Sequence, residues 1–105
     1  MMLLRIVKME FAPAQVQAFD ELFAQYQAHI EAMPGCLRVR LLKGHDEEPI
    51  RTTLSWWERD ADLQAYRKSS LFGEVWPKTK SMFSVPPVTW SSVWPSDEPI
   101  PGAAE

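Results

Sequence analysis

The fold is decided by residues 36–58, CLRVRLLKGHDEEPIRTTLSWWE. The first eight of these residues alternate with a period of two, because the arginines fall on one face of an extended chain and the apolar side chains on the other. That apolar set is Leu37, Val39 and Leu41. Residues 51–58 are rich in β-branched and aromatic side chains, which favour a strand. We therefore predict two paired strands joined by a polar loop at 44–49.

A helix and a strand are predicted before this pair. Over about 13–33 the apolar side chains recur at helical spacing and form one stripe. Pro34 and Gly35 end the helix, because Pro34 disfavours helical geometry at the residue before it and Gly35 can take the positive φ of a turn. Residues 3–11 mix apolar and charged side chains without glycine or proline, which is typical of a strand.

Helical segments and a last strand are predicted after the pair. The acidic residues within 60–62 favour a helix start, where carboxylates meet unpaired backbone N–H groups. Helical spacing of apolar side chains resumes over 69–83, and Pro77 inside it predicts a kink or a break because proline removes a helical hydrogen bond. Residues 88–94 complete the pattern as a fourth strand.

The order strand, helix, strand, strand, helix, strand predicts an α+β fold, the ferredoxin-like split βαβ, with a four-stranded antiparallel sheet and its helices on one face. The length of 105 residues fits a single domain, which we place at 1–94. Residues 95–105 contain prolines and little to bury, so they are expected to form a flexible C-terminal arm or an arm that a partner surface orders.

Apolar side chains on both faces of the predicted sheet indicate a second copy of the chain. Strand 3–11 places Leu4 and Ile6 opposite its other apolar residues, and Trp56 lies opposite Trp57. Helices can cover one face of such a sheet only. We therefore predict a symmetric homodimer in which two sheets pack face to face.

Composition and charge exclude several classes of partner. The 11 basic and 14 acidic residues give a formal net charge of −3 without a basic cluster, so nucleic acid is not expected to bind. Cys36 is the one cysteine, and His29 and His45 are the only histidines, which leaves neither a disulfide nor a zinc site in view. All three residues are expected to be structural or solvated, and no metal is predicted.

The N-terminal segment bears on location. Arg5 and Lys8 interrupt its apolar run too early for a signal peptide, and no segment has the length of a transmembrane span. A cytoplasmic protein without a membrane partner is the expectation.

Four segments carry a resemblance to a known family. They are Arg5-Ile6-Val7-Lys8-Met9, Pro34-Gly35-Cys36, Ser55-Trp56-Trp57-Glu58 and Tyr66-Arg67-Lys68-Ser69-Ser70-Leu71-Phe72. With them, residues 3–94 resemble the antibiotic biosynthesis monooxygenase-like domains of the dimeric α+β barrel superfamily. The resemblance implies a dimeric α+β barrel and an oxidoreductase activity. The family includes cofactor-independent oxygenases of quinols and anthrones, haem-degrading monooxygenases and members of unknown activity.

The haem-degrading branch can be compared residue by residue. That branch has an asparagine, a tryptophan and an iron-ligating histidine at the positions that match Val7, Tyr66 and Trp76. Tryptophan cannot ligate iron and valine has no amide to orient oxygen. We therefore expect no haem and no other cofactor.

The cofactor-free branch needs a dry aromatic slot and a group that favours an ionised substrate. Six residues are candidates for this substrate pocket: Tyr66, Trp76, Lys80, Trp57, Phe72 and Arg5. Trp76 and Lys80 lie four residues apart, and the resemblance places Tyr66 at the same opening, so these three are expected to share one cavity wall. The competing interpretation is that the aromatic residues pack in the core and the two cations are solvated.

Three hypotheses follow. The first is a homodimeric monooxygenase that acts without metal or flavin on a small aromatic or quinone-type compound, with catalytic residues unassigned. The second is a non-catalytic dimer that binds a small apolar or aromatic ligand. The third is a structural dimer module with no pocket. A slot of roughly 300 Å³ or more would argue against the third.

Overall fold

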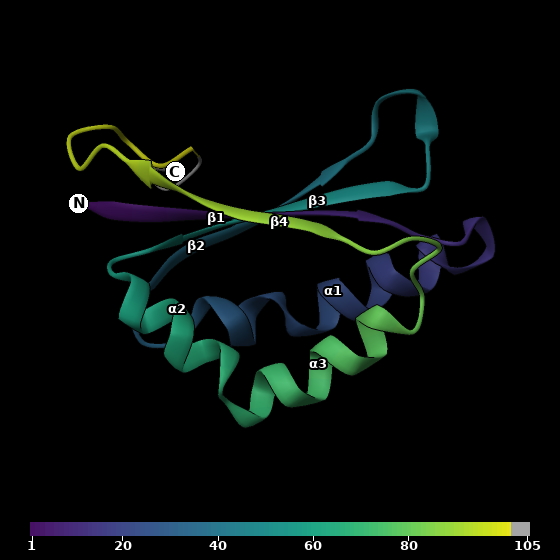
Figure 1. The fold of residues 1–105 in the computed structure, drawn as a ribbon, viewed down its shortest axis with the longest axis horizontal. Coiled ribbons are helices and arrows are strands. Elements are labelled where there is room, and N and C mark those ends of the chain that lie inside the picture. The colour runs from purple at the N-terminus through teal and green to yellow at the C-terminus, as the bar shows by residue number, and fades with distance from the viewer. Residues whose placement is uncertain (102–105) are drawn as a thin grey trace.

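The structure, a computed structural model, describes residues 1–101 (Figure 1). Its strands are β1 (Met2–Glu10), β2 (Cys36–Lys43), β3 (Ile50–Trp57) and β4 (Val88–Trp94). Its helices are α1 (Val16–Glu31), α2 (Asp60–Arg67) and α3 (Ser70–Lys80), with short 3-10 turns η1 (Pro13–Gln15) and η2 (His45–Glu47). The strands form one antiparallel sheet in the order β2-β3-β1-β4. This confirms the predicted ferredoxin-like α+β fold.

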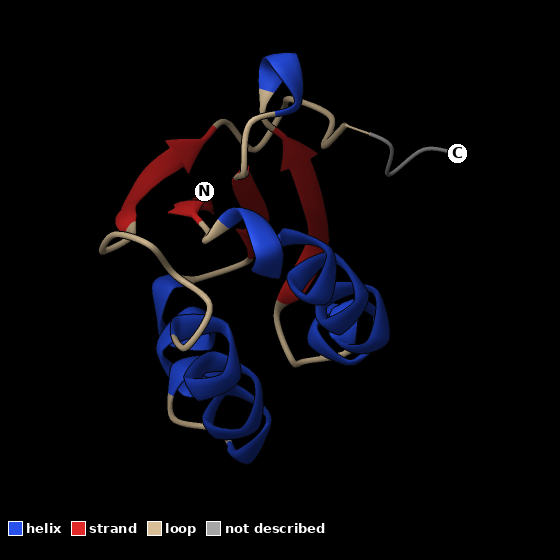
Figure 2. Cartoon of the chain, turned by 90° about the vertical axis from the view of Figure 1, so that its right-hand side faces the viewer, coloured by secondary structure: helices blue, strands red, loops and turns tan. Residues whose placement is uncertain are grey.

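Within residues 1–101 the three α-helices lie on the same face of the sheet, which leaves the other face open (Figures 1 and 2). The pairing register decides which side chains meet the helices. Odd-numbered residues of β1 pair with odd-numbered residues of β3, as in Arg5 with Ser55 and Met9 with Arg51. Because successive side chains of a strand alternate, this whole set points toward the helices.

The core fills the space between α1 and the sheet. Apolar side chains from β1, α1 and β2 are buried there, and the Phe11 and Phe19 rings stack with centroids 4.4 Å apart. The core cluster consists of Met9, Phe11, Phe19, Phe23, Tyr26, Ile30 and Val39. Burial of this apolar stripe fixes α1 against the sheet.

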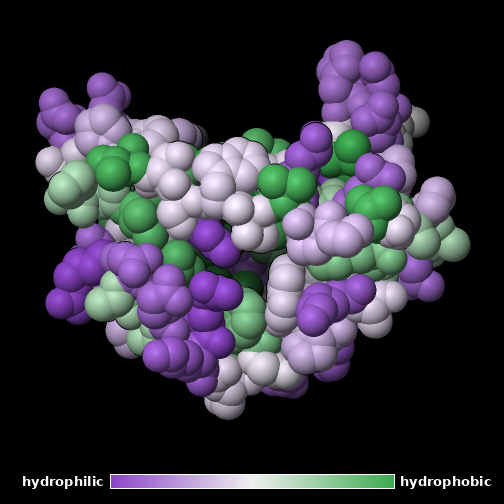
Figure 3. All heavy atoms as spheres, in the orientation of Figure 1, coloured by the Kyte–Doolittle hydropathy of each residue, from purple (hydrophilic) through white to green (hydrophobic). Residues whose placement is uncertain are grey.

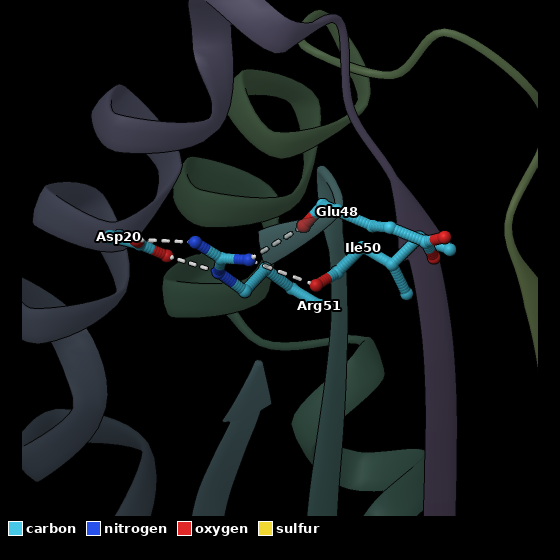
Figure 4. A network of polar contacts seen from close by, with 4 residues as sticks. All are labelled: Asp20, Glu48, Ile50 and Arg51. Atoms are coloured by element: carbon cyan, nitrogen blue, oxygen red, sulfur yellow. Dashed lines mark hydrogen bonds and ion pairs between the residues drawn. The ribbon is translucent and has the colours of Figure 1, made fainter. Parts of the chain in front are cut away.

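One arginine is buried beside this core. Arg51, 8% exposed, donates from Nε and Nη2 to the two carboxylate oxygens of Asp20, at 2.8 and 3.0 Å. Its Nη1 donates to the backbone carbonyls of Glu48 and Ile50, at 3.3 and 2.9 Å (Figure 4). Every guanidinium nitrogen therefore has a protein acceptor, which offsets the cost of burying the charge.

The turn between α1 and β2 requires glycine. Gly35 has φ = 80°, and a Cβ at this position would collide with the Asp62 side chain. Its carbonyl accepts a hydrogen bond from the Glu58 amide at 2.9 Å. The predicted role of Gly35 as the helix-ending turn residue is thereby confirmed.

The pattern of β2 differs from the prediction at one residue. A β-bulge lies between Cys36 and Arg38, which pair with Trp57 and Trp56, so Leu37 is the extra residue. Leu37 is consequently exposed instead of sharing the core face with Val39. The alternating sequence carried no sign of the extra residue.

Pro77 does not break the helix, so of the predicted kink or break only the kink stays a prediction. Helix α3 runs from Ser70 to Lys80 with Pro77 inside it. The Thr79 hydroxyl donates to the Val75 carbonyl at 3.0 Å, so side-chain bonding supplements the backbone pattern around the proline.

The open face carries tryptophan as predicted. Trp56 is nevertheless only 1% exposed, because the Trp94 ring packs edge-on against it with centroids 5.6 Å apart. The Trp94 indole N–H donates to the Glu98 carbonyl at 3.1 Å, so the described part of the C-terminal arm folds back near this corner. The rest of the predicted arm, residues 102–105, lies outside the described residues. Farther along the same face Leu42, Val88 and Trp90 are exposed.

Candidate functional site

A half-open cavity lies between the sheet and helices α1, α2 and α3. Its volume is about 340 Å³. Figure 3 shows the surface hollowed at this place, beneath β4. The sheet contributes Arg5, Val7, Met9, Val39, Thr53, Ser55 and Thr89, and the helices contribute Phe19, Phe23, Ile30, Leu63, Tyr66, Arg67, Phe72, Val75, Trp76 and Thr79, with Pro87 beside β4.

A series of contacting aromatic rings forms one wall. Tyr66 stacks on Trp57 with centroids 5.3 Å apart, and Phe72 meets the edge of Tyr66 at the same distance. Trp76 in turn stacks on Phe72 at 5.6 Å. Tyr66, Phe72 and Trp76, which we call the aromatic wall, all line the cavity. Rings held in this way offer flat, rigid surface to an aromatic ligand.

The junction between α2 and α3 sets the geometry of this wall. Ser69 is the N-cap of α3, and its Oγ accepts a hydrogen bond from the Phe72 amide at 3.2 Å. The same hydroxyl donates to the Tyr66 carbonyl at 2.6 Å. One serine therefore ties the end of α2 to the start of α3, and with them the two rings.

Trp57 supports the wall from behind. It is fully buried and does not line the cavity. Its indole N–H donates to the Ser55 Oγ at 2.9 Å, and Ser55 does line the cavity. Trp57 thus holds both the Tyr66 ring and the Ser55 hydroxyl in place.

Tyr66 faces the cavity in its protonated form. Burial, with a smaller effect of nearby Cys36, raises the pKa of Tyr66 to about 12. Burial likewise raises the pKa of the Cys36 thiol to about 12, so this cysteine is not an activated nucleophile. At neutral pH the Tyr66 hydroxyl is therefore a hydrogen-bond donor and not a base.

Two arginines line the same cavity. Arg5, from the middle of β1, is half-buried and donates from Nη1 to the Ser91 Oγ at 3.2 Å. Burial and the positive charge of Arg67 lower the pKa of Arg5, whereas Asp60 opposes that shift. Arg67 is exposed at the end of α2 and donates to the Gln64 side-chain oxygen at 3.3 Å. The cavity therefore holds two cations, and none of its described lining residues is acidic.

The structure brings together four of the six residues predicted for the pocket. Arg5, Tyr66, Phe72 and Trp76 line the cavity. Trp57 stands one layer behind it. Lys80 does not share the wall: its side chain is exposed, and buried Thr79 takes the inward position instead. A residue four positions after Trp76 can point either toward the cavity or toward solvent. As α3 packs here, Thr79 points toward the cavity and Lys80 points toward solvent.

Sequence reasoning missed Arg67 as a lining residue. A signal was present, because Arg67 lies four residues after Leu63 and so on the same side of α2 as that buried leucine. The hydroxyl groups of Thr53 and Ser55 were also missed. The helix-facing register of β3 places them in the cavity, and that register follows from strand pairing.

The donor set does not fit haem iron or a protein-bound metal. The described lining residues include no histidine or cysteine, and the raised pKa of Tyr66 opposes a phenolate ligand. Within residues 1–101 no three His, Cys, Asp or Glu side chains are grouped as metal ligands. In the same range no helix is both long and apolar enough to cross a membrane.

Solved structures of similar shape share this fold. A conserved protein from Methanosarcina mazei Go1 aligns with a TM-score of 0.82 at 19% identity, covering 87% of this chain and 90% of that one. A protein from Nitrosomonas europaea, described as a candidate antibiotic biosynthesis monooxygenase, aligns with a TM-score of 0.85 at 14% identity, covering 91% and 92%. A similarly described protein from Caulobacter crescentus CB15 aligns with a TM-score of 0.80 at 20% identity, covering 87% of each chain.

Sequence comparison gives the family directly. No curated protein sequence matches the chain. The family model of the antibiotic biosynthesis monooxygenase domain matches residues 2–76, which include β1 to β3, α2 and the aromatic wall. The chain therefore belongs to the antibiotic biosynthesis monooxygenase family.

Proposed function

We propose that the protein is a monooxygenase that oxidises a small hydroxyaromatic or quinone-type compound without metal or flavin. The observation that carries the proposal is the half-open cavity that both the aromatic wall and Arg5 line. A volume of about 340 Å³ exceeds what packing defects leave and argues against a structural module without a pocket.

The reaction needs an electron-rich substrate. In a monooxygenation of this kind a phenol-type ring carbon loses hydrogen and gains one oxygen atom of O₂, giving a quinone, and the other oxygen atom leaves as water. The substrate supplies all four electrons. The ring hydrogen and the hydroxyl proton both end in that water molecule, so no external reductant is required.

Arg5 and Tyr66 have roles in this scheme. The guanidinium of Arg5 stabilises the ionised substrate oxygen and so lowers the substrate pKa. Tyr66 donates a hydrogen bond to developing negative charge, because its raised pKa keeps it protonated. The apolar wall excludes water from the reactive substrate anion.

One observation favours a second candidate, a non-catalytic protein that binds a small aromatic ligand. No histidine, aspartate or glutamate is among the described residues that line the cavity, so no side chain there is an evident general base. In the catalytic case the substrate proton must pass to solvent through the open side, and a proton must return from solvent to form the product water. In the binding case no such transfer is needed.

Oxygen uptake separates the two candidates. We expect O₂ consumption and formation of a quinone with at least one member of a panel of naphthols, quinols and anthrones. The Trp76→Ala and Arg5→Gln variants should lower the rate, and Lys68→Gln, which removes a charge outside the cavity, should retain it. Tight binding with no O₂ uptake across the panel would favour the binding protein.

We also propose that two copies pack through the open faces of their sheets. Support comes from the exposed Leu42, Val88 and Trp90 on that face, beside half-buried Ile6. Light scattering should give about twice the chain mass of 12.1 kDa. Ile6→Asp should dissociate or unfold the protein, because an unpaired charge in such an interface costs several kcal/mol. A stable wild-type monomer at micromolar concentration would contradict this proposal.

A further inference from the structure

The charge of the cavity constrains its ligand further than the aromatic wall does. Arg5 and Arg67 both line it, and none of its described lining residues is acidic. Among the described side chains, those of residues 1–46 and 48–101, the ion pairs are Arg51 with Asp20, Arg59 with Asp62 and His45 with Asp46. Neither of the two cavity arginines has a carboxylate partner in that set.

The two cations also act on each other. Both arginines line the same cavity, and the positive charge of Arg67 is among the causes that lower the pKa of Arg5. Asp60 moderates this effect without lining the cavity. An anion bound beside both arginines would be attracted by both charges.

The unused N–H groups of the two arginines also favour an anionic ligand. Arg5 uses Nη1 toward Ser91, and Arg67 uses Nη1 toward Gln64. The remaining N–H groups of both guanidiniums have no protein acceptor among the described residues. A guanidinium presents paired donors that match the two oxygens of a carboxylate.

Resting on the proposed function, we infer that the ligand is an aromatic carboxylate. Its ring lies against the aromatic wall and its carboxylate lies between Arg5 and Arg67. A carboxylate attached to a ring can lie in the ring plane, which suits a space bounded by flat side chains, whereas a tetrahedral sulfonate is thicker.

A matched set of ligands tests the inference by binding alone. The probes are 3-hydroxy-2-naphthoate, its neutral carboxamide, and 3-hydroxynaphthalene-2-sulfonate, titrated by calorimetry. We expect the carboxylate to bind about tenfold tighter than the amide, because charge-assisted hydrogen bonds are roughly twice as strong as neutral ones. The sulfonate should bind more weakly than the carboxylate.

Variants assign the preference to the two arginines. In Arg67→Gln and in Arg5→Gln the ratio between carboxylate and amide should fall to about threefold or less, with amide affinity little changed. Lys68→Gln makes the same change in net charge one residue from Arg67 and should keep the wild-type ratio. Arg67 is exposed, so its replacement is compatible with folding.

The inference and the proposed function fail in different ways. Equal binding of carboxylate and amide, tighter binding of the sulfonate, no binding of any probe, or a ratio unchanged in both arginine variants would each overturn the inference. O₂ uptake on neutral quinols could still occur in those cases. Conversely, arginine-dependent carboxylate binding without any O₂ uptake would leave the inference standing and overturn the oxygenase.

Discussion

Arg51 lies near one end of the helix-facing side of the sheet and Arg5 lies nearer the other end, and the protein satisfies their charges in opposite ways. At what we call the closed end, Arg51 is buried, and Asp20 and two carbonyls accept from its guanidinium. At the open end, Arg5 has one hydroxyl acceptor, on Ser91, beside a cavity. A satisfied buried cation stabilises a fold, whereas an available one can recognise a ligand. The contrast separates the structural end of this face from the functional end.

Replacing an aromatic residue by alanine should give the largest difference in unfolding free energy between the two ends. Phe11→Ala at the closed end removes a buried ring that stacks on Phe19 without lining the cavity, and should cost about 3–5 kcal/mol of unfolding free energy. Trp76→Ala at the open end removes a half-buried ring and should cost about 1–2 kcal/mol. Urea denaturation measures both.

Ligand binding should show the reverse order. Trp76→Ala should weaken naphthoate binding by at least about tenfold, since it removes a stacking surface. A Trp76→Ala variant that loses as much stability as Phe11→Ala but retains affinity would make Trp76 a core residue and remove the distinction between the ends.

The next largest difference in unfolding free energy should come from substitutions at the two arginine sites. Asp20→Ala leaves the Arg51 guanidinium buried without its carboxylate and should cost about 2–3 kcal/mol, somewhat below a fully buried pair because Asp20 is partly exposed. Arg5→Gln should cost less than about 1 kcal/mol, because the amide can still donate to Ser91. Equal losses in chemical denaturation would show that Arg5 is as structural as Arg51.

The sequence was most informative where the pattern of residues is local. The apolar stripe of α1, the strand alternation and the turn at Gly35 are local patterns, and each produced the element it predicted. The resemblance of the segment Tyr66–Phe72 to its family placed Tyr66 and Trp76 at one opening, and both rings line the same cavity.

The open end was harder because it depends on tertiary choices. The packing of α3 selects Thr79 over Lys80, although both have helical spacing from the aromatic residues. The bulge at Leu37 arises from how β2 pairs with Trp56 and Trp57, which alternation alone does not encode. From the sequence alone Arg67 is an exposed cation at the end of a helix, and only the structure shows that it lines the cavity.

Alkaline pH should lower the unfolding free energy through two residues at the open end, by less than the substitutions above. The folded-state pKa values of Cys36 and Tyr66, both about 12, lie above their ordinary values of 9.0 and 10.0. The folded protein therefore holds these two protons more tightly than the unfolded chain does. Their contribution is complete below about pH 9 and is lost as pH rises toward 12.

Urea denaturation at pH 8, 9.5 and 11 checks this slope. The double variant Cys36→Ala with Tyr66→Phe should lose less stability over that range than wild type. Val75→Ala lines the same cavity and retains both groups, so it should keep the wild-type slope. A double variant with an unchanged slope would show that ionisation of these residues is not what weakens the fold.

The smallest expected effect is that of adding haem, which we expect not to bind through its iron. The open end offers no histidine or cysteine among its described lining residues, so titration with haemin should give no sharp Soret shift of a ligated iron. Tight binding, with haem degraded in the presence of a reductant, would mean that the match of Trp76 to the iron-ligand position is wrong.

The position of a bound ligand tests the central claim most directly. A crystal structure of the protein with 3-hydroxy-2-naphthoate should show the ring against the aromatic wall and the carboxylate within hydrogen-bonding distance of Arg5 and Arg67. Electron density for the compound on the open sheet face, or a cavity closed by its own side chains with no ligand inside, would contradict the assignment of this end of the molecule to function.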